Sequence, residues 1–187
     1  MCLKSLEFLP VGRGRLVVAF SGRKPTAGEV FLAFKEHIMR AILQRVTRAS
    51  IKVDGRITGA ISRGLVVLLG IRRGDGERQI EYLADKILDL RIFPDEKHSM
   101  NRSIREAGGG ILLVSQFTLY GDARKGRRPS FDDAEAPELA VKVYRQFAER
   151  LSTQGVRPEE GVFGASMLLD LENDGPVTIL LDSEREF

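Results

Sequence analysis

The 187-residue sequence contains one cysteine, two histidines and no tryptophan. With Cys2 as the only thiol, neither an internal disulfide nor a zinc site of several thiolates can form. Its longest aliphatic run, Leu65–Leu69, is far shorter than the ~20 apolar residues that span a bilayer. Apolar residues make up 43 % of the chain and charged residues 29 %, which is typical of a globular protein. We therefore expect a single-domain, soluble, cytoplasmic protein without membrane contact.

The charge and the histidines are unevenly distributed. The formal net charge is +3, and residues 1–38 hold six basic and three acidic side chains, so residues 39–187 are electrically balanced. Bulk charge thus gives no support for nucleic-acid binding. Residues 39–187 contain His98 as their only histidine and no cysteine, which excludes Cys–His catalysis and histidine-cluster metal sites. We expect no metal and no other cofactor.

The regular pattern of the chain begins at Met39. Before it, only residues 29–38 have apolar side chains at helical spacing. We interpret residues 1–38 as an N-terminal extension, either a start codon assigned too early or a poorly ordered segment, and residues 39–187 as the functional domain.

Within this domain the hydrophobic pattern predicts strands joined by short turns, with two helices. Asp54-Gly55 is typical of a two-residue hairpin turn, Asp75 is the expected N-cap of the first helix, and Pro137 the first residue of the second. The predicted strands are 40–49, 50–53, 56–61, 65–71, 111–120, 162–171 and 177–182, and the predicted helices are 77–90 and 137–151. The apolar stripes of the helices are Ile80, Leu83, Ala84, Ile87 and Leu88, and Leu139, Val143, Phe147 and Leu151. The fold class is α+β: mainly antiparallel β-sheets forming a barrel-like domain with two flanking helices.

Polar residues interrupt the apolar strand predicted at 111–120. Alternation along a strand places Gln116 and Thr118 on one face and Ser115 and Phe117 on the other. A strand end that precedes a Gly-Asp turn often presents hydroxyl and N–H groups to a cleft. The alternative is structural, since strand Ser and Thr residues commonly bond to local backbone.

Two further segments are candidates for binding. The sequence Asn173-Asp174-Gly175-Pro176 is either an ordinary turn or a cis Gly-Pro pair whose carbonyl oxygens point the same way. A loop over 123–133 carries four basic residues, which either contact phosphate groups or simply face water. They are Arg124, Lys125, Arg127 and Arg128. The loop lacks the Lys-Ser/Thr pair of a phosphate-binding P-loop. His98 lies in a polar loop and is expected to be exposed and inert.

Residues 39–187 resemble the D-aminoacyl-tRNA deacylase family. The matching segments are Met39–Val46, Ser115–Asp122, Gly164–Met167 and Asn173–Thr178. The resemblance implies a homodimeric hydrolase of translation quality control. Its substrate would be the ester that joins a D-amino acid, or a mischarged glycine, to the 3′-terminal ribose of tRNA.

The resemblance also implies roles for residues near the C-terminus and in the first strand of the domain. Gly175 and Pro176 would form a cis pair that enters the active site of the other subunit, bind the substrate α-amino group and exclude an L side chain. Arg45 would hold this pair in place, and Met167 would lie near the pocket.

The Ser115–Thr118 segment would then form the pocket floor. Backbone N–H groups of Gln116, Phe117 and Thr118 would stabilise the oxyanion. Thr118 is either a nucleophile, which needs a nearby base, or a group that positions others while the ribose 2′-hydroxyl assists a water. The four basic residues of the 123–133 loop are the candidate contacts to tRNA phosphates. Two alternatives remain open: an L-specific relative, and a non-catalytic tRNA-binding module or an editing domain that serves a synthetase in trans.

Overall fold

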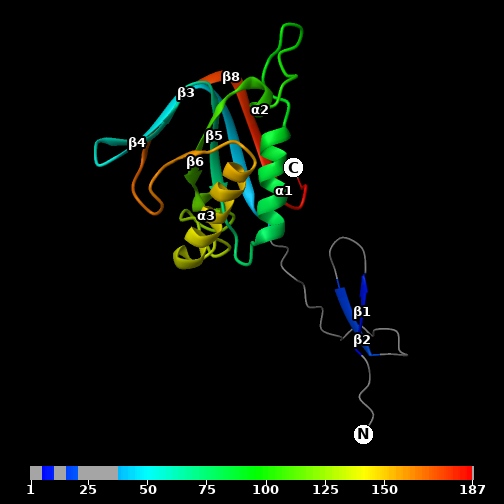
Figure 1. Cartoon of the computed structure of the whole chain (residues 1–187). Helices are drawn as coiled ribbons and strands as arrows, with labels where there is room; N and C mark the ends of the chain where they lie inside the picture. The colour runs from blue at the N-terminus through cyan, green and yellow to red at the C-terminus, as the bar shows by residue number, and fades with distance from the viewer. Residues whose placement is uncertain (1–5, 11–15, 21–37, 187) are drawn as a thin grey trace. The chain divides into compact units, whose positions relative to one another are not determined.

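The computed structural model describes residues 6–10, 16–20 and 38–186 (Figure 1). Contacts divide the chain into two units, Met1–Glu36 and His37–Phe187. In the first unit, strands β1 (Leu6–Pro10) and β2 (Leu16–Phe20) pair antiparallel, a hairpin that the sequence did not lead us to expect. The helical pattern of residues 29–38 lies almost wholly outside the described residues.

The second unit is built on a six-stranded mixed sheet. Strand β3 pairs antiparallel with β4, β5 and β8, whereas β5, β6 and β7 run parallel to one another. The strands are β3 (Arg40–Val53), β4 (Arg56–Ile61), β5 (Gly64–Gly70), β6 (Gly110–Ser115), β7 (Glu159–Glu160) and β8 (Leu168–Asp182). The predicted α+β, barrel-like fold class is confirmed, although three of the strands are parallel.

The sheet curls until its two edge strands, β4 and β7, approach each other. A Cβ atom placed on Gly59 of β4 would lie 2.6 Å from the backbone oxygen of Glu160 in β7, so only glycine allows this approach. At the other end of β4, Asp54 and Gly55 both have positive φ and form the predicted hairpin turn to β3. The result is a nearly closed barrel.

The first long helix, α1 (Glu77–Asp89), buries the predicted apolar stripe against the sheet. Its N-cap is Gly76 and not Asp75, because an Asp75 carboxylate oxygen accepts the Arg72 backbone N–H at 2.6 Å. A short helix, α2 (Ile104–Ala107), was not predicted, since four residues are too few to show a period.

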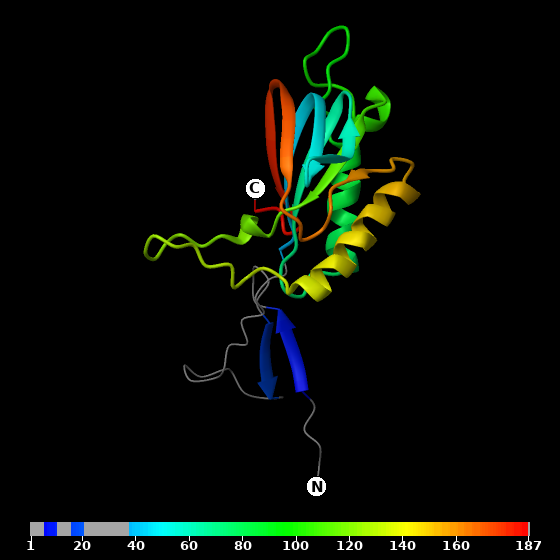
Figure 2. The same cartoon turned by 90° about the vertical axis from the view of Figure 1, so that its left-hand side faces the viewer.

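The second long helix, α3 (Pro137–Thr153), begins at the predicted proline. Its buried face is rotated from the predicted one: Leu139 is 50 % exposed, whereas Ala140 and Tyr144 are buried. The Tyr144 hydroxyl donates a hydrogen bond to the Leu113 carbonyl of β6 at 3.0 Å, which ties this face to the sheet. Both α1 and α3 lie on the same side of the sheet (Figure 2).

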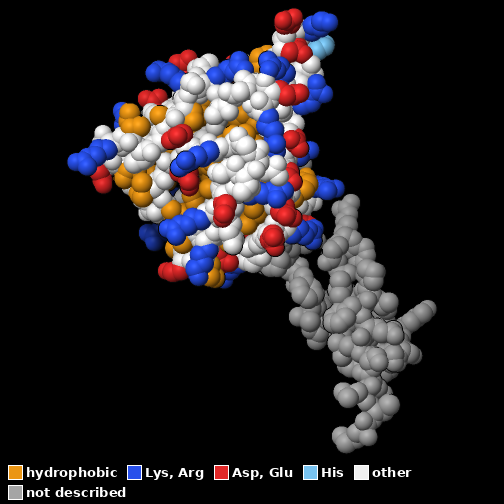
Figure 3. Space-filling model, in the orientation of Figure 1, with side chains coloured by type: hydrophobic (Ala, Val, Ile, Leu, Met, Phe, Trp, Pro, Cys, Tyr) orange, Lys and Arg blue, Asp and Glu red, His pale blue; other side chains and the backbone are white. Residues whose placement is uncertain are grey.

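Apolar side chains form two clusters, one on each side of the sheet. The larger lies between the sheet and the helices and includes Leu43, Val67 and Phe147. The smaller fills the barrel and includes Ile51 and Leu112. Charged side chains of both signs are interspersed over the described part of the surface in Figure 3, in keeping with the balanced charge of the domain.

Strand β8 differs most from the prediction. Residues 162–167 are not strand, and β8 continues through residues 173–176, which we predicted to be a turn between two strands. Thr178 pairs with Gln44, and Asn173 pairs with Val46. Between these two pairs the chain advances by two residues along β3 but by five residues along β8. Three extra residues, Asp174, Gly175 and Pro176, therefore bulge from the strand. We call them the β8 bulge, and its Gly175–Pro176 peptide bond is cis.

Candidate functional site

The polar segment after β6 forms a single turn of 3₁₀-helix. Strand β6 ends at Ser115, and η1 (Phe117–Tyr120) follows, so the predicted strand through residue 120 and its alternation of faces were wrong. The Gln116 N–H, which we expected to donate to the oxyanion, instead donates to the Leu69 carbonyl of β5 at 2.7 Å, as a continuation of the β5–β6 pairing. At the end of η1, Tyr120 is buried, and its hydroxyl bonds to the backbone carbonyls of Ile38 and Gly70. These contacts favour the turn over a continued strand.

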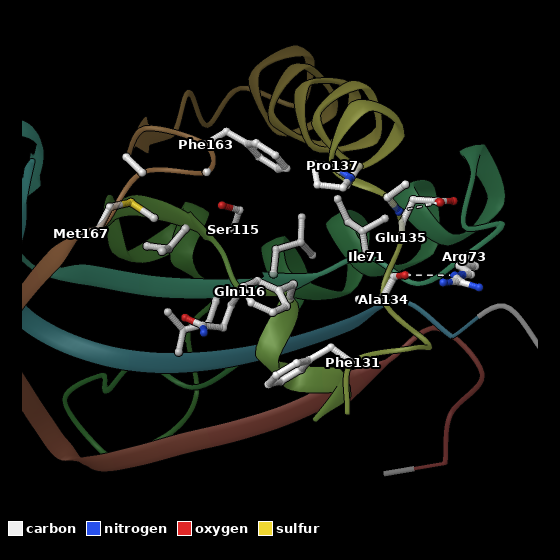
Figure 4. Close-up of a pocket in the computed structure, with 18 of the residues that line it drawn as sticks. Ile71, Arg73, Ser115, Gln116, Phe131, Ala134, Glu135, Pro137, Phe163 and Met167 are labelled. Atoms are coloured by element: carbon white, nitrogen blue, oxygen red, sulfur yellow. Dashed lines mark hydrogen bonds between the residues drawn. The ribbon is translucent and has the colours of Figure 1, made fainter. Parts of the chain in front are cut away.

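A cavity of about 700 Å³ opens where the parallel strands β5 and β6 end (Figure 4). Carboxyl ends of parallel strands are a common place for ligand sites, because the chain leaves the sheet there. Three of the four predicted catalytic residues, Ser115, Gln116 and Phe117, line it, as does Met167. The other lining residues are Leu68, Leu69, Ile71, Arg73, Val114, Phe131, Ala134, Glu135, Ala136, Pro137, Ala140, Phe163, Gly164, Ala165 and Leu169. The cavity is thus mostly apolar, with Arg73, Ser115, Gln116 and Glu135 as its polar lining residues.

Thr118, the fourth predicted catalytic residue, does not line the cavity. Its exposed hydroxyl oxygen accepts a hydrogen bond from the side-chain amide of Gln116. Within residues 38–186 this amide is the only hydrogen-bond partner of the Thr118 hydroxyl, and an amide does not accept a proton as a base does.

Two backbone N–H groups at the start of η1 precede its first internal hydrogen bond. That bond runs from the Leu119 N–H to the Gln116 carbonyl at 3.3 Å. The N–H groups of Phe117 and Thr118 lie before it, in the position where the first N–H groups of a helix lack an internal partner. Such groups can donate to a carbonyl oxygen that develops negative charge.

An aromatic pair stands beside these groups. Phe117 is 57 % exposed, and its ring meets that of Phe131 edge to face, with ring centroids 5.0 Å apart. Both rings line the cavity and offer an apolar surface to a bound base or side chain. Phe131 was missed because a single aromatic residue at the end of a basic loop has no periodic signal.

Arg45 lies away from the cavity, buried beside the β8 bulge. Its Nε is 2.9 Å from an Asp174 carboxylate oxygen, and one of its terminal nitrogens donates to the Ile92 carbonyl at 2.5 Å. A Cβ on Gly175, whose φ is +128°, would lie 3.2 Å from the other terminal nitrogen. The Arg45 guanidinium therefore joins the bulge to the loop after α1.

The β8 bulge and the cavity of the same subunit lie far apart. Ser115 of β6 pairs with Leu69 of β5, which in turn pairs with Ala41 of β3. The bulge, in contrast, lies beside Arg45 of β3. Four residues along a strand span ~13 Å, and the three strand spacings from β6 to β8 span ~14 Å. Accordingly, neither Gly175 nor Pro176 lines the cavity.

The predicted basic residues lie on an exposed loop that projects from the domain between η1 and α3 (Figure 2). Two backbone hydrogen bonds between Asp122 and Ser130, of 2.8 and 3.0 Å, close its neck. Arg124 bonds through two side-chain nitrogens to Asp122, which holds the pKa of that carboxyl well below its usual range and raises the pKa of Arg124.

The other three cations of this loop differ from Arg124. Lys125, Arg127 and Arg128 are exposed and form no ion pair with any described residue. They are therefore the cations of the loop that remain open to an anionic partner. Phe131, at the end of the same loop, lines the cavity, so the loop adjoins the site.

His98 is exposed in the loop after α1, as predicted, and does not line the cavity. In the described part of the chain, no three His, Cys, Asp or Glu side chains lie close enough together to bind a metal ion. None of the described helices combines the length and the apolar character needed to cross a membrane.

Comparisons with known proteins agree on one group of relatives. A family model described as D-Tyr-tRNA(Tyr) deacylase matches residues 42–182. A D-aminoacyl-tRNA deacylase of Koribacter versatilis is 58 % identical over 149 residues, which are 80 % of this chain and all of the relative. That of Kosmotoga olearia is 55 % identical over 149 residues, again 80 % of this chain and all of the relative.

Two solved structures are also similar. A structure described as c-Myc DNA Unwinding Element Binding Protein has a TM-score of 0.71 and 44 % identity, and the match covers 76 % of this chain and 97 % of that one. A probable eukaryotic D-amino acid tRNA deacylase has a TM-score of 0.69 and 21 % identity, with 78 % and 99 % covered. At that identity the second likeness concerns the fold alone.

Proposed function

The chain belongs to the D-Tyr-tRNA(Tyr) deacylase family, and we propose that it hydrolyses the ester of D-aminoacyl-tRNA and of glycyl-tRNA while it rejects L-aminoacyl-tRNA. Such an activity removes wrongly charged tRNA before translation. The observation that carries the proposal is the cavity at the ends of β5 and β6, lined by Ser115, Gln116 and Phe117 of the family's motif.

The reaction is an attack of water on the ester carbonyl. The N–H groups of Phe117 and Thr118 would donate to the oxyanion that forms. The bond between the carbonyl carbon and the ribose 3′-oxygen then breaks, and that oxygen takes a proton, which releases the free amino acid and tRNA. Because the Thr118 hydroxyl bonds to an amide and to no base, we favour a positioning role for it, with a substrate hydroxyl assisting the water.

A second subunit would bring the β8 bulge to the cavity. On the face of the sheet turned away from the helices, Leu180 lies opposite Ile42, which lies opposite Leu68 of the cavity wall, so an apolar row runs from the cavity to β8. Leu180 is 49 % exposed. A two-fold axis through this row would place each bulge, midway along β8, near the cavity of the other subunit.

The bulge would then act by occupying space. Gly175 and Pro176 are both exposed, and a Cβ on Gly175 would lie 2.7 Å from a methyl group of Val177, so no larger residue fits there. In the partner's cavity their carbonyl oxygens would bind the substrate amino group and fill the space that an L side chain needs. Glycine has no side chain and would pass.

The exposed cations of the loop next to the cavity complete the proposal. Lys125, Arg127 and Arg128 would contact phosphates of the tRNA acceptor end, while the apolar cavity holds the aminoacylated terminus.

The test measures hydrolysis of D-Tyr-tRNA, L-Tyr-tRNA and Gly-tRNA by the purified protein. We expect rapid release of D-Tyr and Gly and no release of L-Tyr above the spontaneous rate. Preferred hydrolysis of L-Tyr-tRNA would assign the chain to L-specific relatives. Binding of all three without hydrolysis would make it a tRNA-binding module.

A further inference from the structure

Arg40, the first residue of β3, contacts the far end of the turn that carries the proposed oxyanion donors. One of its terminal nitrogens donates to the Leu119 carbonyl at 3.0 Å. Its guanidinium carbon lies 5.3 Å from the centroid of the Tyr120 ring, within the range of a cation–π contact. Its Nε is buried without a hydrogen-bond partner, so the Leu119 bond and the ring hold the guanidinium.

The C-terminal end of η1 is thus attached to the start of the domain. The Tyr120 hydroxyl lies 2.7 Å from the Ile38 carbonyl oxygen and 3.0 Å from that of Gly70. Burial raises the pKa of this hydroxyl far above its usual range, so it stays a neutral donor. A guanidinium suits the other attachment, because the carbonyls at a helix end carry partial negative charge.

We propose that Arg40 is a positioning residue for the deacylation reaction. It does not line the cavity and touches no reacting group. It fixes the Leu119 carbonyl, and one turn of 3₁₀-helix transmits that position to the N–H groups of Phe117 and Thr118. The inference rests on the proposed function, which assigns these N–H groups to the oxyanion.

The experiment compares Arg40→Gln and Arg40→Lys with a matched control, Arg48→Gln. Arg48 lies on the same strand, is exposed and pairs with Glu172 at 3.1 Å, away from η1. We expect Arg40→Gln to lower kcat on D-Tyr-tRNA about tenfold with KM little changed, because misaligned donors stabilise the bound ester as before but the transition state less well. Arg40→Lys should recover part of kcat, since an ammonium can donate to the Leu119 carbonyl. Arg48→Gln should leave both parameters unchanged.

A second readout separates this inference from the proposed function. The backbone ¹H and ¹⁵N chemical shifts of Phe117 and Thr118 should move in Arg40→Gln and stay in place in Arg48→Gln. If the native protein deacylates no tRNA, the proposed function fails while these shifts still report on the positioning. Unmoved shifts, or a kcat within twofold of the native value in Arg40→Gln, overturn the inference. If Arg40→Gln does not fold, Arg40→Met takes its place, because it keeps an unbranched side chain without a donor to the Leu119 carbonyl, and the same two outcomes overturn the inference.

Discussion

At the scale of single residues, the Arg45–Asp174 pair links two segments that are distant in the chain. Arg45 is buried. Its guanidinium forms an ion pair with the Asp174 carboxylate and donates hydrogen bonds to the carbonyls of Ile92 and Ser99. A buried cation with a single acidic partner is sensitive to the loss of that partner's charge. The orientation of the β8 bulge therefore depends on this ion pair.

Asp174→Asn tests the dependence, because it keeps the shape of the side chain and removes its charge. We expect the ratio of L-Tyr-tRNA to D-Tyr-tRNA hydrolysis to rise, since a bulge that moves excludes the L side chain less well. The free energy of unfolding should fall by about 1–3 kcal/mol, the cost of an unsatisfied buried polar group. Deacylation assays measure the ratio, and urea unfolding measures the free energy of unfolding. The control variant is Asp170→Asn, at an exposed position on the same strand. A ratio equal to that of this control would contradict the prediction.

Thr118→Val tests the role of the hydroxyl that the sequence left open. Because this hydroxyl bonds only to the Gln116 amide within the described domain, we expect the single-turnover rate on D-Tyr-tRNA to stay within about threefold of the native rate, whereas loss of a nucleophile costs several orders of magnitude. A fall of that larger size would make Thr118 the nucleophile.

The sequence located the site better than it described its shape. Polar residues within an apolar strand pointed to Ser115 and Gln116, and both line the cavity. The turn that follows depends on tertiary hydrogen bonds from the Tyr120 hydroxyl to the carbonyls of Ile38 and Gly70. No local sequence pattern predicts such contacts. Arg40 was missed for the same reason.

At the scale of elements, the projecting basic loop contains one internally paired cation and three that are not. Arg124 is held by Asp122, whereas Arg127 and Arg128 have no ion-pair partner among the described residues. The loop is narrow at its neck, so a substitution at its tip leaves the cavity wall in place.

Arg127→Ala with Arg128→Ala should weaken tRNA binding and flatten its dependence on salt. Each phosphate that the protein no longer neutralises changes the slope of log K against log salt by about 0.7–0.9, so the slope of the double variant should be smaller by about 1.4–1.8. Arg124→Ala is the matched control and should change the slope less, because Asp122 already neutralises that charge. Binding titrations with tRNA that carries no amino acid, at four or five salt concentrations, measure the slope. An unchanged slope in the double variant would mean that the loop only faces water.

Elements with a simple period were predicted well, and elements set by distant pairing were not. The stripe of α1 and the β3–β4 hairpin follow from local spacing and turn residues. Asn173–Pro176 has the composition of a turn. However, β3 pairs with the residues of β8 both before and after this segment, so β8 remains one strand. The rotation of α3 likewise depends on the Tyr144 bond to β6.

At the scale of the whole molecule, the cavity and the bulge of one subunit lie apart, separated by four residues along the strands and by three strand spacings across the sheet. A pair of subunits related by a two-fold axis would restore the complete site twice, at both ends of the shared face. The assembled state, and not the single chain, would then discriminate between D and L substrates.

Leu180→Lys tests this assembly. Leu180 is 49 % exposed in the single chain, so the substitution should leave the subunit folded while it places a charge in the proposed interface. We expect light scattering to show the native chain as a dimer and the variant as a monomer with lower selectivity for D-Tyr-tRNA. Leu139→Lys, at a position 50 % exposed on α3, is the control and should remain dimeric. A monomeric native chain, or an equally dimeric and selective Leu180→Lys variant, would contradict the two-fold arrangement.

The three-residue excess in β8 also makes the bulge a removable insert. If Asp174, Gly175 and Pro176 were removed, β3 and β8 would have the same number of residues between the pairs Gln44–Thr178 and Val46–Asn173. Val177 would then lie opposite Arg45. Both side chains are buried, and Val177 packs in the helix-side cluster, so the alternation of faces survives the shortening. The barrel and the bulge can therefore vary independently. If the bulge excludes the L side chain as we propose, other short peptides grafted at this point of the strand would change which acyl group is rejected.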